Sequence, residues 1–349
     1  MWYGWKCQED QDNSSRRDGA PLFERIWLVI RTLGEWITQH VAAGLPPDLA
    51  TIVAEIASAS AELASQLRTA PLDGLTGATE SVNVQGEVQK PLDILANDIF
   101  MAACHRCAGA SYAVSEELDL ETPIHADGRF AVIFDPLDGS SNLDVNVTVG
   151  SIFSVIPAAF GDALLSPGNT QVFAGFAAYG PATSLVLTFG TSVDLFVLGG
   201  DGVWQLARSG LTVPVDTTEI AINSSREMQW DKAISGYVAA CFRPTKHSDK
   251  VYNSRWVGSM VADILRILIR GGVFLYPAGK KAAKTGGRLR LLYEANPMAL
   301  LITTAGGAAT TGKHPILDLT PTELHQRVAV ILGSRNEVDN IRARYVLDS

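Results

Sequence analysis

One strand-and-turn segment, residues 129–142, constrains this chain most strongly. Ala131–Phe134 is a short apolar run rich in strand-forming residues, which predicts a buried strand. Asp135 is expected to end this strand, because the following residue, Pro136, cannot donate to a hydrogen-bonded ladder. Asp138 comes three residues after Asp135. Two carboxylates are therefore expected at the mouth of one strand, where oxygen ligands suit a hard divalent cation.

The residues that follow favour an anion. Gly139, Ser140 and Ser141 would let successive backbone N–H groups converge on a phosphate. A divalent cation beside a phosphate cradle predicts metal-assisted phosphoryl chemistry. The alternative interpretation is a surface turn without a function, since Asp-Pro-x-Asp-Gly turns are common.

Further carboxylates are predicted at the ends of other elements, where an α/β sheet presents ligands to a crevice. A predicted strand over 111–116 leads into Glu116 and Glu117, and a predicted strand over 288–294 ends in Glu294. Asp93 lies near the start of a predicted helix that runs from Pro91 to the Cys104–Cys107 pair. With Asp135 and Asp138, these make six carboxylates. Six are too many for a buried site without cations.

Hydrophobic periodicity predicts the remaining elements. These are helices within 22–40, over 48–66 and from a Ser259 cap to Arg270, a helix starting at Asn296, and strands within 146–157, 171–198 and 273–277. The pattern breaks into turns at 199–213, so we place a domain boundary there. A loose tail over 1–20 would precede an N-terminal domain, 21–208, and a C-terminal domain, 209–349.

Net charge and the length of the apolar runs limit the classes of partner that this protein is expected to bind. The net charge of −9 does not favour a nucleic-acid partner. No apolar run approaches the roughly 18 residues needed to span a membrane, so no membrane partner is expected. Arg16-Arg17 is followed by an apolar stretch too short for an export signal, and we expect a cytoplasmic protein.

The four cysteines are too few and too scattered for a disulfide framework in a chain of 349 residues. Cys104 and Cys107 form a C-x-x-C pair, but no second pair exists for a structural zinc site. Two packed or half-exposed thiols are the favoured interpretation, and a redox or metal role is the alternative.

The segment 134–153 resembles the signature of class I fructose-1,6-bisphosphatases. The resemblance runs from about Thr32 to the C-terminus, and its other strong blocks are 92–98, 115–117, 257–278 and 288–312. It implies an α/β fold of the fructose-1,6-bisphosphatase type, a layered sandwich with two sheet-containing domains in alternating α-β-α-β-α layers. It also implies hydrolysis of D-fructose 1,6-bisphosphate to fructose 6-phosphate and phosphate, in a homo-oligomer that is a dimer of dimers.

The resemblance implies two or three Mg²⁺ ions per subunit, with Mn²⁺ as an alternative, which would polarise the 1-phosphate and activate a bound water. The metal ligands would be Glu116, Glu117, Asp135, the carbonyl of Leu137, Asp138 and Glu294. The groups that orient or deprotonate the water would be Asp93, Glu117 and, from a loop over 70–91, Glu87. The transferred phosphoryl group would contact Asp138, Gly139, Ser140 and Ser141. The sugar and distal phosphate would contact Asn223, Arg255, Trp256, Gly258, Ser259, Met260, Tyr276 and Arg288.

Several residues depart from the family pattern. Arg226 and Trp256 stand where the family commonly has Tyr, and Arg288 replaces its usual Lys. Arg255 corresponds to an arginine that reaches a neighbouring subunit's site. Other substrates stay open, namely sedoheptulose 1,7-bisphosphate or, less favoured, an inositol monophosphate. A non-catalytic sugar-phosphate binding protein is the remote alternative, and the pathway, gluconeogenesis or carbon fixation, stays open.

The resemblance also bears on AMP, which inhibits some family members. In those enzymes a Lys-Tyr pair opens the strand that here begins at Arg129-Phe130, and an Arg closes the next strand. Phe130 lacks the hydroxyl, and no Arg stands near Pro157. Pro46 and Pro47 remove two N–H donors from the segment that would cradle the AMP phosphate. We therefore expect AMP to inhibit poorly.

Overall fold

The candidate site is built on two β-sheets and the helices that pack on them. The computed structural model describes residues 31–75, 90–158, 162–243, 250–279 and 286–347. Residues 31–349 belong to one compact unit. The expected tail, 1–20, and the loop residue Glu87 lie outside the described residues.

The first sheet has eight strands in the order β2-β1-β3-β4-β5-β6-β7-β8. Their bounds are β1 Ala110–Ser115, β2 Thr122–Pro123, β3 Phe130–Asp138, β4 Val149–Pro157, β5 Phe173–Tyr179, β6 Thr183–Thr188, β7 Val193–Leu198 and β8 Trp204–Arg208. Strands β3 to β8 are antiparallel neighbours, whereas β1 is parallel to β3, with Ser115 opposite Phe134. Because β1 is parallel to β3 in this register, Glu116, which directly follows β1, lies beside Asp135 of β3.

The second sheet has the order β10-β9-β11-β15-β13, and β12 pairs with β14 apart from it. The bounds are β9 Glu219–Ile222, β10 Asn253–Ser254, β11 Val273–Tyr276, β12 Leu289–Arg290, β13 Ala308–Thr310, β14 Arg327–Val328 and β15 Val330–Gly333. The boundary that we place between residues 208 and 209 stays a prediction.

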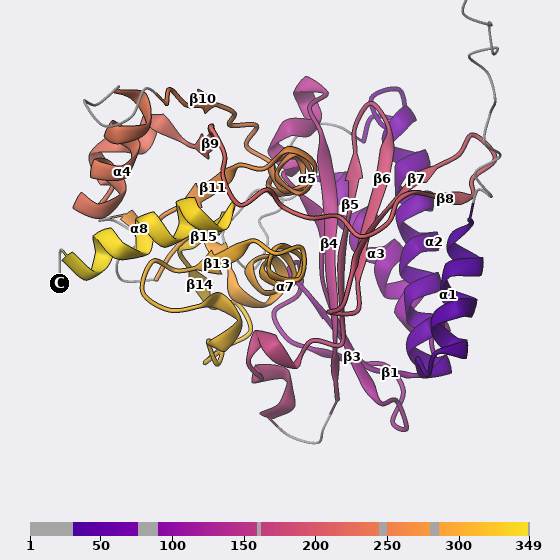
Figure 1. Ribbon diagram of the computed structural model, residues 1–349. Helices are drawn as coiled ribbons and strands as arrows, with labels where there is room; N and C mark the ends of the chain where they lie inside the picture. The colour runs from indigo at the N-terminus through magenta and orange to yellow at the C-terminus, as the bar shows by residue number, and fades with distance from the viewer. Residues whose placement is uncertain (1–30, 76–89, 159–161, 244–249, 280–285, 348–349) are drawn as a thin grey trace, which may run out of the picture. The chain divides into compact units, whose positions relative to one another are not determined.

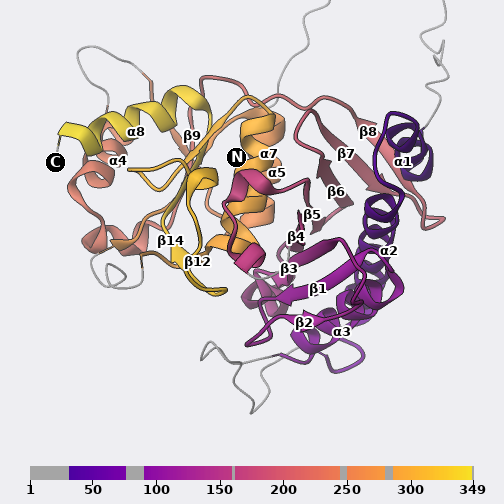
Figure 2. The same cartoon turned by 90° about the horizontal axis from the view of Figure 1, so that it is seen from below.

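Helices cover both faces of both sheets (Figure 1). Their bounds are α1 Leu33–Ala42, α2 Pro47–Thr69, α3 Pro91–Arg106, α4 Lys232–Phe242, α5 Met260–Arg270, α7 Asn296–Thr304 and α8 Arg335–Leu347. Helices α2 and α3 lie against the outer face of the first sheet, beside β1 and β3 (Figure 2). Helices α5 and α7 lie between the two sheets, and α4 and α8 cover the far face of the second sheet.

Strand alternation explains these layers. In β4, Phe153 packs into the cluster under α1, α2 and α3, whereas its neighbour Ile152 packs against α5 and α7. Successive side chains of a strand point to opposite faces, so a strand buried on both faces reads as a continuous apolar run. The layered α/β architecture expected from the sequence is confirmed.

One predicted strand end is wrong. Strand β3 does not stop at Asp135 but continues through Pro136 to Asp138. Its pairing with β4 shifts between Asp135, opposite Ile152, and Asp138, opposite Gly150. This shift is a β-bulge, and a proline is tolerated there because a bulged residue need not donate to the ladder.

Two other expectations are corrected. The apolar run 288–294 is not one strand, because only Leu289–Arg290 pair, and Leu291–Ala295 form a π-helical turn that leads into α7. The turn region 199–213 contains a further strand, β8, at the edge of the first sheet. In both places the tertiary partner selects the conformation over the local pattern.

Candidate metal centre and phosphate pocket

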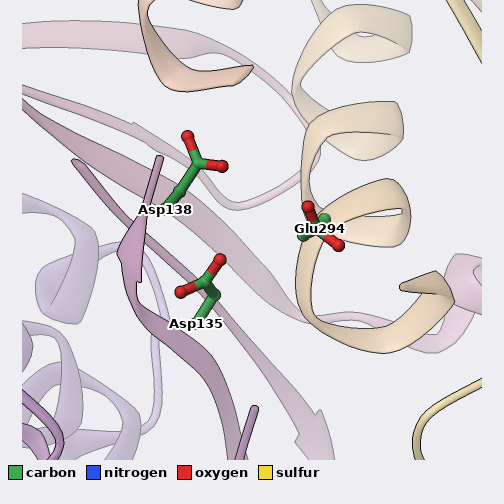
Figure 3. Close-up of side chains that lie close together, drawn as sticks. All are labelled: Asp135, Asp138 and Glu294. Carbon is green, nitrogen blue, oxygen red and sulfur yellow. The ribbon is translucent and has the colours of Figure 1, made fainter. Parts of the chain in front are cut away.

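Three buried carboxylates from distant parts of the chain converge at one point. Asp135 and Asp138 lie on β3, and Glu294 faces them from the π-helical turn before α7 (Figure 3). One carboxylate oxygen of each residue lies within 4.8 Å of the other two. None of the three residues is more than 8% exposed. Three carboxylate oxygens at such distances could hold one hard divalent cation.

The electrostatics of this cluster fit a cation. Burial raises the pKa of Asp138 to about 6. Burial, and after it the charge of Glu116, raises the pKa values of Asp135 and Glu294 well above their ordinary range. Carboxylates held this close in a buried site disfavour one another's charge, and a divalent ion removes that penalty.

Arg290 also reaches the cluster, and sequence reasoning missed it. Its guanidinium lies 3.1 Å from an oxygen of Glu116, and its backbone N–H donates to Glu294 at 2.5 Å. The Arg290 side chain is only 8% exposed. A charged residue inside the apolar run Leu289–Tyr293 was the available signal. The guanidinium offsets one of four neighbouring carboxylates, so an excess of negative charge remains.

The other predicted metal ligands lie close to the cluster. Glu116 follows β1 directly, and its N–H donates to the carbonyl of Phe134 at 3.1 Å. Leu137 is buried in the bulge and donates its N–H to Asp135 at 3.0 Å. Glu117 is partly buried, and its N–H donates to the hydroxyl of Ser115 at 3.2 Å.

Asp93 is a buried carboxylate with an unused oxygen. Its Oδ2 accepts a hydrogen bond from the N–H of Lys90 at 2.8 Å, while its buried Oδ1 has no partner among the described residues. Burial, together with the nearby charge of Glu117, raises the pKa of Asp93 to about 6. The ammonium group of Lys90 donates to the carbonyl of Ser140 at 3.1 Å, which ties Asp93 to the phosphate cradle.

The expected cradle is the start of a short 3-10 helix, Ser140–Val145. Gly139 precedes it with a φ of 76°, in the left-handed region that glycine adopts easily. A Cβ atom at Gly139 would also lie 2.9 Å from the Cβ of Ser259. The N–H groups of Ser140 and Ser141 open the helix and have no acceptor within it, so they can donate to an anion.

Ser259 connects α5 to the carboxylate cluster. It occupies the expected N-cap position, but its hydroxyl makes no capping bond and donates instead to Asp138 Oδ2 at 3.2 Å. The N–H of Val261 donates to the same oxygen at 3.2 Å. Met260, between them, is buried. Asp138 thus caps α5 from another part of the chain.

A second polar site lies between the first turn after β9 and the end of β11. Asn223, Tyr276 and Arg288 line one pocket there, which encloses about 320 Å³ of space, part of it open to solvent. The structure therefore brings three predicted distal-phosphate residues together. Arg226, a noted departure to which the sequence assigned no role, lines the same pocket.

Three other predicted substrate residues lie outside the lining of this pocket. Trp256 packs on Tyr276, with ring centroids 5.6 Å apart, and Gly258 lies beside its indole nitrogen. Arg255 is half-exposed, and its Nε lies 3.7 Å from a carboxylate oxygen of Glu219. Their roles stay predictions.

The cysteine pair lies apart from these groups. Cys107 ends α3, and both Cys104 and Cys107 are buried and free. Burial raises the pKa of both thiols, that of Cys107 to about 12. Protonated, buried thiols act as small apolar side chains. Across the described part of the chain, no helix combines the length and apolarity that crossing a bilayer requires.

Comparisons with known proteins agree over nearly the whole described chain. The family model described as the N-terminal domain of fructose-1-6-bisphosphatase matches residues 31–209, and the model of the C-terminal domain matches residues 213–346. A fructose-1,6-bisphosphatase class 1 from Methylibium petroleiphilum is 46% identical over 324 residues, which cover 88% of this chain and 91% of that protein. The crystal structure of Leishmania major fructose-1,6-bisphosphatase in holo form is similar with a TM-score of 0.85 and 33% identity, over 91% of this chain and 99% of that one.

The raised pKa of Asp138 predicts how the stability of the metal-free protein depends on pH. The folded state keeps this proton up to about pH 6, whereas the unfolded chain releases it near pH 4. The contribution is therefore fully present below about pH 4 and is lost as the pH rises through about 6. In EDTA, thermal unfolding should show a smaller decrease in Tm between about pH 5 and pH 7 for Asp138→Asn than for the wild type.

Added Mg²⁺ or Mn²⁺ should raise the Tm of the wild type near neutral pH and have little effect on the variant, because an ion stabilises the state that binds it. An equal rise in Tm for both proteins would contradict a metal site at Asp138.

Proposed function

The chain belongs to the class 1 fructose-1,6-bisphosphatase family, so it is a phosphatase that hydrolyses D-fructose 1,6-bisphosphate, and we propose that it does so at the cluster of Asp135, Asp138 and Glu294. The observation that carries this proposal is the convergence of the three buried carboxylates beside the turn Gly139-Ser140-Ser141. The products are fructose 6-phosphate and phosphate.

Asp135, Asp138 and Glu294 would hold divalent cations, two or three Mg²⁺ per subunit with Mn²⁺ as an alternative, and Glu116, Glu117 and the carbonyl of Leu137 complete the proposed ligand set. Such ions, when bound, supply Lewis-acid polarisation of the 1-phosphate and lower the pKa of water. The all-oxygen donor set favours a hard ion of this kind.

The chain's own groups would position the phosphoryl group and accept a proton. The N–H groups of Ser140 and Ser141 donate to the oxygens of the 1-phosphate. Asp93 Oδ1 accepts the proton of the attacking water, because a carboxyl group with a pKa of about 6 is ionised at neutral pH and still basic enough to act. Glu117, and Glu87 from outside the described residues, share this role in the proposal.

The distal phosphate would bind in the pocket of Asn223, Tyr276 and Arg288. Gly258, Ser259 and Met260 would shape the sugar site between this pocket and Asp138, since Ser259 contacts Asp138 and Trp256 contacts Tyr276. Arg255 would complete the site of a neighbouring subunit. We therefore propose a homo-oligomer, a dimer of dimers, located in the cytoplasm.

The first test is a phosphate-release assay with fructose 1,6-bisphosphate and sedoheptulose 1,7-bisphosphate, in Mg²⁺ and in EDTA. Asp138→Asn should reduce kcat by more than about 100-fold, since partners outside the ligand set are already worth about 10–100-fold. Circular dichroism should show that the variant keeps its fold. Near-normal turnover by a folded Asp138→Asn protein would contradict the proposed site.

A complementation experiment tests the shared site. Arg255→Ala and Asp138→Asn chains are each expected to be weakly active, but a mixed oligomer contains some sites with both residues intact. Mixing with subunit exchange, followed by native mass spectrometry, should restore part of the phosphate release. If exchange occurs without any recovery, Arg255 does not act across an interface.

Poor inhibition by AMP is the expected regulatory property. Arg129 is already paired with Asp48, which lies 2.7 Å away at the start of α2, so its charge faces a carboxylate. Pro46 and Pro47 supply no N–H donors there. Losing two charge-assisted hydrogen bonds, each worth about 1.5–3 kcal/mol, weakens binding by roughly two orders of magnitude or more. Titration of AMP into the phosphate-release assay measures this, and cooperative inhibition at micromolar AMP would refute it.

A further inference from the structure

The bulge in β3 is held by a buried serine of the neighbouring strand. Because the pairing of β3 with β4 shifts at the bulge, Ser151 of β4 alone stands opposite the two residues between Asp135 and Asp138. Its hydroxyl donates to the carbonyl of Pro136 at 2.7 Å. Ser151 is 0% exposed, so this hydroxyl must find its partners within the protein.

A second hydroxyl group fixes the direction of this bond. The phenol oxygen of Tyr179, at the end of β5, lies 2.8 Å from the Oγ of Ser151. A carbonyl can only accept, so the proton of Ser151 points to Pro136 and the hydroxyl of Tyr179 donates to Ser151. Tyr179 packs in the apolar cluster under α1, α2 and α3. A chain of hydrogen bonds therefore runs from β5 through β4 to the bulge in β3.

This chain lies on the face of the sheet away from α5. Successive side chains of a strand alternate, so Ser151 points away from the face on which its neighbour Ile152 packs against α5. Asp138 contacts the start of α5, on that other face. The two hydroxyl groups can therefore affect the carboxylates only through the backbone of the bulge. In the bulge, the N–H of Leu137 donates to Asp135 Oδ1 at 3.0 Å, which couples the backbone to a carboxylate.

We propose that Ser151 and Tyr179 are positioning residues for the metal centre, and that their hydrogen bonds fix the bulge so that its oxygen ligands converge on one ion. These ligands are Asp135, Asp138 and the carbonyl of Leu137. The inference rests on the proposed function, because it takes the carboxylate cluster as the metal site. Groups that orient metal ligands without touching the ion change metal affinity or activity by about 10–100-fold when they are mutated.

The test is a calorimetric titration of Mn²⁺ into the metal-free protein near neutral pH. Ser151→Ala should weaken Mn²⁺ binding about 10-fold or more, because the carbonyl of Pro136 loses its donor and the bulge is no longer fixed. Ser151→Thr keeps a hydroxyl group and should restore most of the affinity. Tyr179→Phe leaves the bond to Pro136 in place, so its affinity should lie between those of the wild type and Ser151→Ala. In the phosphate-release assay, the Mg²⁺ concentration for half-maximal rate should rise in the same order.

Ser111→Ala is the matched control. The hydroxyl of Ser111, buried on β1, donates to the carbonyl of Phe130 at 2.9 Å, at the other end of β3. Ser111→Ala and Ser151→Ala each deprive a carbonyl of β3 of a hydroxyl donor, so both should lower the Tm in EDTA. Only Ser151→Ala should lose affinity for Mn²⁺.

Two results would overturn the inference and leave the proposed metal centre standing. One is wild-type affinity for Mn²⁺ in Ser151→Ala, or in Tyr179→Phe if Ser151→Ala does not fold, while Asp138→Asn no longer binds the ion. The other is an equal loss of affinity in Ser151→Ala and Ser111→Ala, since lower stability alone would then explain both. Undiminished Mn²⁺ binding by Asp138→Asn, by contrast, would contradict the proposed function itself and this inference with it.

Discussion

The hydrogen bonds between Asp138 and the start of α5 hold the site together. One oxygen of Asp138 accepts from both the hydroxyl of Ser259 and the N–H of Val261. Helix α5 packs between the two sheets. A carboxylate at a helix N-terminus is stabilised by the unpaired N–H groups and the helix dipole. The same residue therefore lines the carboxylate cluster and attaches the helix that lies between the sheets, so the cluster forms only when both layers are packed.

The cost of burying charge indicates that the carboxylates of the cluster serve function more than they stabilise the fold. Asp135, Asp138 and Glu294 are buried, and burial raises the pKa of each. Well-packed apolar residues at these positions would avoid the cost of burying charge. The ion pair between Arg290 and Glu116 offsets part of that cost. Folded proteins keep such locally unfavourable groups chiefly where a ligand completes them.

Sequence reasoning predicted what local patterns and motif order determine. The strand at Ala131–Phe134 and the helix from Pro91 follow from local patterns, and the family resemblance identified the carboxylates that converge. Contacts between residues far apart in the sequence could not be predicted from these patterns. Ser259 was predicted as a helix cap from the local pattern, but the partner of its hydroxyl lies 121 residues away. The π-helical turn before α7 was missed because Leu291–Tyr293 has the apolar pattern of a strand, and only packing against the first sheet selects the turn.

The bulge in β3 decides whether the side chains of Asp135 and Asp138 lie on the same face of the sheet. Residues three apart on a regular strand point to opposite faces, so Asp135 and Asp138 would be separated by the sheet. The bulge places three residue steps of β3 against two of β4, and both carboxylates emerge on one side (Figure 3). The number of residues from Asp135 to Asp138 thus matters for the site independently of which residues lie between them. Leu137 could change to another apolar residue without moving either carboxylate, whereas inserting or deleting one residue would turn one of them to the other face.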